Sequence, residues 1–138
     1  MPALDRDHSI VKRALIQGGW IVTDDPLRLR VGTRDLYVDL GAEQLLAAQK
    51  GTRKIAVEVK TFRGLSDVRD LEAALGQFVL YRDILAEQEP DREVFVAVTI
   101  AVAQGILQEE LGKLILRRGT AQFLVYNAQE EIIVQWLP

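Results

Sequence analysis

The chain has no cysteine, one histidine and one methionine among its 138 residues. Without cysteine it can form no disulfide and no thiolate metal site, which suits a reducing compartment. Any metal site must therefore use oxygen ligands or His8. No apolar run approaches the about 18 residues that a membrane span needs, and the segment Asp5, Arg6, Asp7 interrupts any secretory apolar block. We expect a single domain, residues 1–138, in the cytoplasm and away from membranes.

The chain also lacks a strong net charge of either sign. Its 17 basic and 20 acidic residues leave a net charge of −3, so the whole molecule does not attract phosphate. DNA would have to meet a local basic patch. Three basic clusters are Arg28, Arg30 and Arg34; Lys50, Arg53 and Lys54; and Lys113, Arg117 and Arg118. The second cluster is our candidate for DNA binding, and the alternative for every cluster is an ordinary solvated surface.

The spacing of apolar residues, which make up 49% of the chain, predicts an α/β protein. Helices are expected at 5–18, 66–89 and 105–116, and strands at 20–23, 27–31, 36–40, 45–49, 53–62, 93–100, 122–126 and 132–136. Strands 45–49 and 53–62 should form a hairpin around Gly51, and the last two strands a C-terminal β-hairpin. The run 93–100 is nearly all apolar, which is typical of a buried central strand. This order predicts a mixed β-sheet flanked by helices.

A charged pair stands near the end of strand 53–62. Side chains alternate along a strand, so Glu58 and Lys60 share one face. A carboxylate and an amine in this arrangement are ordinary exposed charges unless a second carboxylate converges on them. Asp39, in the preceding predicted strand, is the first candidate for that second carboxylate.

Asp39 with Glu58-Val59-Lys60 resembles the PD-(D/E)xK signature of the restriction-endonuclease-like superfamily, and the predicted element order resembles its core. The resemblance implies that Asp39, Glu58 and the Val59 backbone carbonyl hold Mg²⁺ and that Lys60 orients or activates water. Mg²⁺ suits such a site because it prefers oxygen ligands and keeps several waters.

Gln77 and Tyr81 share one face of helix 66–89. They resemble the QxxxY element of the RecB-type and phage-exonuclease-like members of the same superfamily, which implies that Gln77 positions substrate. The alternative is that Tyr81 belongs to the core and Gln77 is simply a good helix former.

Over nearly its whole length the chain resembles the XisH family of fdxN-element excision-controlling factors. The similar segments are DPL (25–27), DLYVDLGAE (35–43), IAVEVK (55–60), ALGQF (74–78) and QWLP (135–138). The family implies a role in excising a DNA element during cell differentiation, together with a site-specific recombinase and the companion factor XisI. A homodimer is a further expectation.

The chain departs from the nuclease signature because Val38, not proline, precedes Asp39. A hairpin centred between Lys50 and Gly51 would also set Glu43 opposite Glu58 and leave Asp39 about 13 Å away along the strand. One ion could not bridge that distance. Either the strand bends at Gly41, or the hairpin register is shifted, or Glu43 is the alternative ligand.

His8 and Asp25 are accessory candidates, with Tyr81. His8 begins the first helix and is either a surface or capping group or a site residue, and Asp25 before Pro26 is either a turn former or an extra ligand. Trp20 and Trp136 are expected in the core or at an interface.

Two functions of different kinds follow from the sequence. The chain is either a Mg²⁺-dependent endonuclease that uses Asp39, Glu58, Lys60 and Gln77, or a non-catalytic accessory protein. An accessory protein would use an inherited nuclease fold to bind a partner protein or DNA. The acidic composition favours the accessory protein. The presence of Asp39, Glu58 and Lys60 together favours the endonuclease.

Overall fold

A six-stranded mixed sheet lies at the centre of the fold and confirms the α/β prediction. The computed structural model describes residues 6–35, 45–62 and 66–138. The strand order is β1-β4-β5-β6-β7-β8, in which β5, β6 and β7 are parallel and the other neighbours antiparallel. These strands are β1 (Ile21–Asp24), β4 (Leu45–Lys50), β5 (Arg53–Val59), β6 (Arg92–Thr99), β7 (Phe123–Asn127) and β8 (Ile132–Leu137). A separate antiparallel pair consists of β2 (Arg30–Val31) and β3 (Arg34–Asp35).

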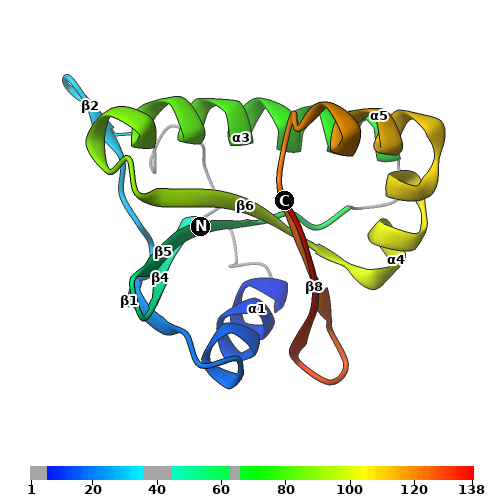
Figure 1. The fold of residues 1–138 in the computed structure, drawn as a ribbon, viewed down its shortest axis with the longest axis horizontal. Helices are drawn as coiled ribbons and strands as arrows, with labels where there is room; N and C mark the ends of the chain where they lie inside the picture. The colour runs from blue at the N-terminus through cyan, green and yellow to red at the C-terminus, as the bar shows by residue number, and fades with distance from the viewer. Residues whose placement is uncertain (1–5, 36–44, 63–65) are drawn as a thin grey trace.

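Helices cover both faces of the sheet (Figure 1). They are α1 (Arg6–Gln17), α3 (Asp67–Gln88), α4 (Ile100–Gln104), the 3₁₀ turn η1 (Ile106–Gln108) and α5 (Glu110–Arg118). α3 and α5 lie over one face, where Phe78 and Ile115 share a core with Val96 of β6. α1 lies over the opposite face, where Val11 shares a second core with Phe95 of the same strand. β6 is therefore buried on both sides, as its apolar run predicts.

The long helix α3 begins and ends close to the predicted residues. The Ser66 side chain accepts a hydrogen bond from the Arg69 N–H, and Asp67 and Asp70 complement the helix dipole in the first turn. Pro90 follows its end. The buried side chains of α3 recur at helical spacing and turn toward the sheet; they are Leu71, Ala74, Phe78, Tyr81 and Leu85.

The hairpin of β4 and β5 forms around Gly51, but its register differs from the one assumed for Glu43. Lys50 pairs with Arg53, and Gly51 takes a positive φ of 59° at the first position of the two-residue turn. The hairpin centre therefore lies between Gly51 and Thr52, and Leu45 pairs with Glu58. The register thus moves the residue opposite Glu58 from position 43 to position 45, away from Asp39; Asp39, Gly41 and Glu43 lie outside the described residues, so which carboxylate meets Glu58 stays a prediction.

Two predicted elements are corrected. The helix expected at 105–116 is divided into η1 and α5, and a short helix that was not expected, α4, precedes them, where Thr99 caps its start by accepting from the Val102 N–H at 3.3 Å. The strand expected at 27–31 is reduced to β2; before it, the Leu27 N–H donates to the Leu45 carbonyl at 2.6 Å. The strand expected at 36–40 lies outside the described residues.

Trp20 belongs to the core, as one of its two expected roles predicts, and Trp136 is partly buried and packs against the same core. Trp20 is buried, and its ring centroid lies 5.7 Å from that of Trp136, which meets Phe95 edge-on at 5.0 Å.

No helix within the described ranges has the length and apolarity to cross a membrane.

Candidate functional site

Glu58 and Lys60 lie at the carboxyl end of β5, in the middle of the sheet. Glu58 is completely buried, with Leu45 of β4 and Val96 of β6 as its neighbours in the sheet. It lies on the same face as Ala56, which belongs to the core beneath α3. The Lys60 N–H donates to the Ala97 carbonyl at 3.1 Å, so backbone pairing with β6 continues one residue past the end of β5.

The Val59 carbonyl points away from β6. Backbone groups alternate in direction along a strand, and the Lys60 N–H is directed at β6. The Val59 carbonyl therefore points toward β4, whose described residues begin at Leu45 opposite Glu58. This places a backbone oxygen at the same end of the strand as the buried carboxylate.

α3 brings Gln77 and Tyr81 over the face of the sheet that holds Glu58. Tyr81 is 3% exposed and belongs to the core, as one of its two interpretations predicts. The Gln77 Oε1 atom is buried and accepts no hydrogen bond from any residue in the described ranges. A buried acceptor of this kind is where a water, an ion or a substrate group gains a hydrogen bond. The role of Gln77 in positioning substrate stays a prediction.

The donor atoms at this end of β5 fit Mg²⁺ in chemistry. One carboxylate and one backbone carbonyl are oxygen ligands, and Mg²⁺ commonly uses one or two carboxylates and completes its shell with water and phosphate oxygens. Asp39 and Glu43, the candidates for a second carboxylate, lie outside the described residues. Among the described residues, no three acidic or histidine side chains come together as a metal-binding group.

A second polar cluster lies across the sheet, beside α1. The His8 Nε2 atom lies 2.8 Å from one Asp25 oxygen, and the Lys12 Nζ atom lies 2.8 Å from the other. Because a carboxylate only accepts, His8 Nε2 carries the proton in this hydrogen bond. His8 is only 4% exposed. The structure thus joins the accessory candidates His8 and Asp25 to each other; whether they serve the site stays a prediction.

Asp7 is a buried residue that the sequence analysis did not single out as a candidate functional residue. The Tyr126 hydroxyl of β7 donates to Asp7, which is 7% exposed. Tyr126 pairs with Thr99, near the carboxyl ends of the parallel strands. This hydrogen bond therefore holds the first turn of α1 near the carboxyl ends of the parallel strands, the end of the sheet where Lys60 lies. No local pattern could have shown this contact, because 119 positions separate the two residues.

The Asp25 cluster predicts acid sensitivity. Burial opposes the shift, but hydrogen bonds from Lys12 and His8 outweigh it and hold the Asp25 pKa below its ordinary value of 3.8. A lowered pKa in the folded state contributes stability above the unfolded pKa, and this contribution is lost as pH falls through the folded pKa. We expect Asp25→Asn to lose less stability than wild type between pH 5 and pH 2 in urea denaturation. An equal loss of unfolding free energy in the two proteins over this pH range would contradict this prediction.

The basic cluster predicted to bind DNA is engaged within the fold. The Lys50 Nζ atom donates to the Gly18 carbonyl at 2.8 Å, beyond the end of α1. Arg53 pairs with Glu93 at 3.3 Å and lies over the Trp20 and Trp136 rings.

Lys54, the third member of this cluster, lies 3.6 Å from an Asp91 oxygen. Arg53 is five residues from Glu58, about 16 Å along β5. DNA contact by this cluster stays a prediction, and it would be separate from the carboxyl end of β5.

The fold is that of an α/β protein with a central mixed sheet. Its candidate site residues Glu58 and Lys60 lie at the carboxyl end of the central strand β5. A protein-family model described as XisH protein matches residues 1–134. The chain belongs to the XisH family, which confirms the family resemblance seen in the sequence.

Solved structures agree with this membership. An XisH family protein from Nostoc punctiforme PCC 73102 is 35% identical, with a TM-score of 0.87 over 97% of this chain and 100% of that one. An fdxN element excision controlling factor protein from Anabaena variabilis is 38% identical, with a TM-score of 0.86 over 96% of this chain and 100% of that one. No curated protein sequence gives a match.

Proposed function

We propose that the chain acts in the excision of a DNA element and that it cuts DNA with the residues at the carboxyl end of β5. Family membership supports the first part, since the similar protein from Anabaena variabilis is described as an fdxN element excision controlling factor. The second part treats the fold as a variant of the restriction-endonuclease-like core. The complete burial of Glu58 is the observation that supports it most.

Glu58 is set among apolar residues of the sheet. Its strand neighbour on the same face is Ala56, and it pairs with Leu45 and Val96. A buried carboxylate loses its hydration, which costs free energy that a bound cation would offset. The complete burial of Glu58 beneath α3 therefore supports a role in metal binding.

Each residue has a distinct role in the proposed reaction. Glu58, the Val59 carbonyl and Asp39 would hold Mg²⁺. When bound, Mg²⁺ supplies positive charge to the phosphate and lowers the pKa of water. Lys60 orients the attacking water or takes up its proton. Gln77 accepts a hydrogen bond from water or substrate through its buried Oε1 atom.

The second candidate function is a non-catalytic accessory factor that binds DNA or a partner protein, with XisI and a site-specific recombinase as the partners that the family implies. One observation favours it. Lys50, Arg53 and Lys54 already have partners within the chain, and the net charge is −3. With this cluster engaged and a negative net charge, the chain would gain little nonspecific affinity for DNA from these three residues.

Incubation of the purified protein with supercoiled and branched DNA, with Mg²⁺ or with EDTA, separates the two functions. The proposal predicts nicked or linear product that requires the divalent ion. Intact DNA under all conditions, with retarded complexes on a native gel, would instead support the accessory function.

A further inference from the structure

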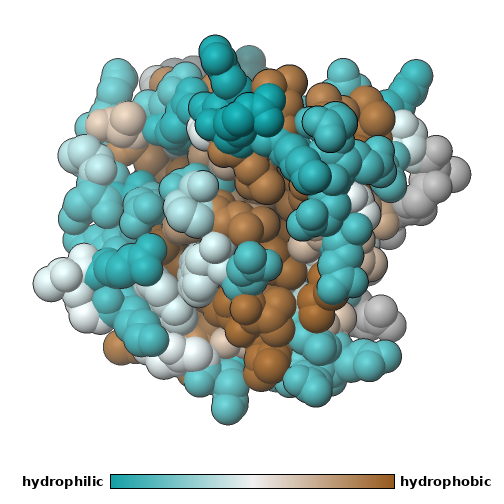
Figure 2. Space-filling model, turned by 45° about the vertical axis from the view of Figure 1, so that its right-hand side comes forward, coloured by the Kyte–Doolittle hydropathy of each residue, from teal (hydrophilic) through white to brown (hydrophobic). Residues whose placement is uncertain are grey.

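The outward face of α5 combines exposed leucines with opposite charges at its two ends. We define the α5 face as Glu110, Leu111, Leu114, Arg117 and Arg118. Leu111 and Leu114 are 41% and 43% exposed, whereas Gly112 and Ile115 on the inner side are buried. Figure 2 looks toward the side of the molecule that bears α4, α5 and β8, where hydrophobic residues reach the surface among hydrophilic ones.

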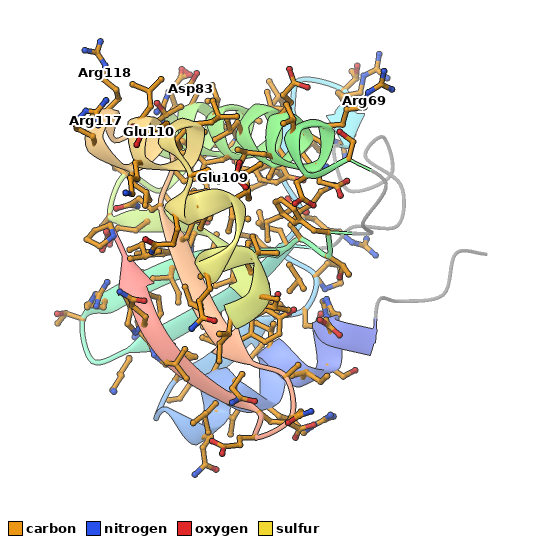
Figure 3. The ribbon with its side chains drawn as sticks, turned by 90° about the vertical axis from the view of Figure 1, so that its right-hand side faces the viewer. Arg69, Asp83, Glu109, Glu110, Arg117 and Arg118 are labelled. Carbon is orange, nitrogen blue, oxygen red and sulfur yellow. The ribbon has the colours of Figure 1, made fainter. Side chains whose placement is uncertain are left out.

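The charges on the α5 face have no partners of their own within the described chain. Glu110 begins the helix and Arg117 and Arg118 end it, and no ion pair forms between any of them and another described residue. Figure 3, which looks roughly along α5, shows Arg117 and Arg118 extending away from the helix, and along the chain Glu110 lies in its first turn and the two arginines in its last. The helix thus presents a negative end, an apolar middle and a positive end.

This arrangement is complementary to itself. On a helix with 100° per residue, Glu110 and Arg118 lie one turn before and one turn after Leu114, each about 40° from it. A twofold axis at Leu114 would set two such helices antiparallel. Glu110 would then face Arg118 of the second copy, at both ends of the contact.

We propose that two copies of this chain associate through the α5 face in this antiparallel arrangement. Leu114 of each copy packs on its equivalent, and Leu111 packs under the aliphatic stem of Arg117 of the second copy. A parallel arrangement of the two helices would instead place like charges together at both ends of the contact. DNA would be a poor partner for this face, because Glu109 and Glu110 would repel its phosphates. The contact is small, because α5 has nine residues and is about 14 Å long. We therefore expect a weak dimer that forms at micromolar concentration or above.

Sedimentation velocity over a concentration series tests the proposal. Wild type is expected to shift from monomer to dimer, and Leu114→Glu should weaken the dimer at least about tenfold by burying two like charges. Val134→Glu on β8 is the matched control, since Val134 is 46% exposed and lies outside the α5 face. It should associate as wild type does. Circular dichroism confirms that both variants are folded.

Charge exchange tests the antiparallel geometry. Glu110→Arg and Arg118→Glu should each weaken association about fivefold, and the double variant should restore it. Wild type that is still monomeric at about 1 mM would overturn the proposal, as would equal association of Leu114→Glu and wild type. A double variant as weak as the single ones would overturn the antiparallel pairing.

Discussion

Lys60→Ala and Glu58→Gln are each expected to reduce Mg²⁺-dependent DNA cleavage by about 10²- to 10⁴-fold, the range that a positioned proton-transfer group usually contributes. In the proposed reaction Lys60 would act on the attacking water, and Glu58 would hold the ion that binds the phosphate. Glutamine keeps the size of Glu58 and removes its charge, so the expected loss is chemical. Initial rates on supercoiled DNA at saturating Mg²⁺ measure both variants.

The control variant for this experiment lies at the other end of the neighbouring strand. Glu93→Gln removes a carboxylate charge from β6. Glu93 lies at the amino end of its strand, away from Glu58, and forms a surface ion pair with Arg53. We expect this variant to cleave within about twofold of wild type, because a surface ion pair contributes little to stability. Cleavage that persists in both Lys60→Ala and Glu58→Gln would exclude the site.

Gly112→Ala should destabilise the fold by more than about 3 kcal/mol, at the upper end of the usual cost of overpacking. A Cβ atom at this position would lie 2.2 Å from the Ile106 carbonyl oxygen and 2.4 Å from the Leu107 Cα atom. Both are backbone atoms of η1, so no side-chain rotation relieves the overlap. The close approach of α5 to η1 therefore requires glycine.

Gly76→Ala is the matched control for this prediction. Gly76 lies in the middle of α3, and a Cβ atom there would meet nothing within 4 Å. Alanine in an exposed helix interior is favoured over glycine by about 1 kcal/mol, so this variant should be more stable than wild type. Urea denaturation of both variants measures the difference. Equal free energies of unfolding for Gly112→Ala and wild type would contradict the packing described for α5.

Local patterns predicted most of the fold because each depends on neighbours in sequence. The apolar run of β6, the Ser66 cap of α3 and the glycine turn at Gly51 are all signals within a few residues. The hairpin register was not determined in this way, since moving the centre of a two-residue turn by one residue changes every pair. The earlier helix start at Thr99 was missed because the same residue also ends a strand.

Alternation along β5 predicted that Glu58 and Lys60 share a face, but not how deeply Glu58 is buried. Burial depends on Leu45, Val96 and α3, which come from three other segments of the chain. The joining of His8 to Asp25 and of Asp7 to Tyr126 likewise depends on how α1 docks on the sheet. Contacts of this kind have no counterpart in local periodicity.

The central claim, that Glu58 holds a divalent ion at the carboxyl end of β5, is tested most directly by calorimetric titration with Mg²⁺ and Mn²⁺. Wild type and Glu93→Gln should bind with equal affinity, and Glu58→Gln should bind at least about tenfold more weakly, the loss expected when a ligand or its close support is removed. Equal binding by Glu58→Gln and wild type would contradict the claim.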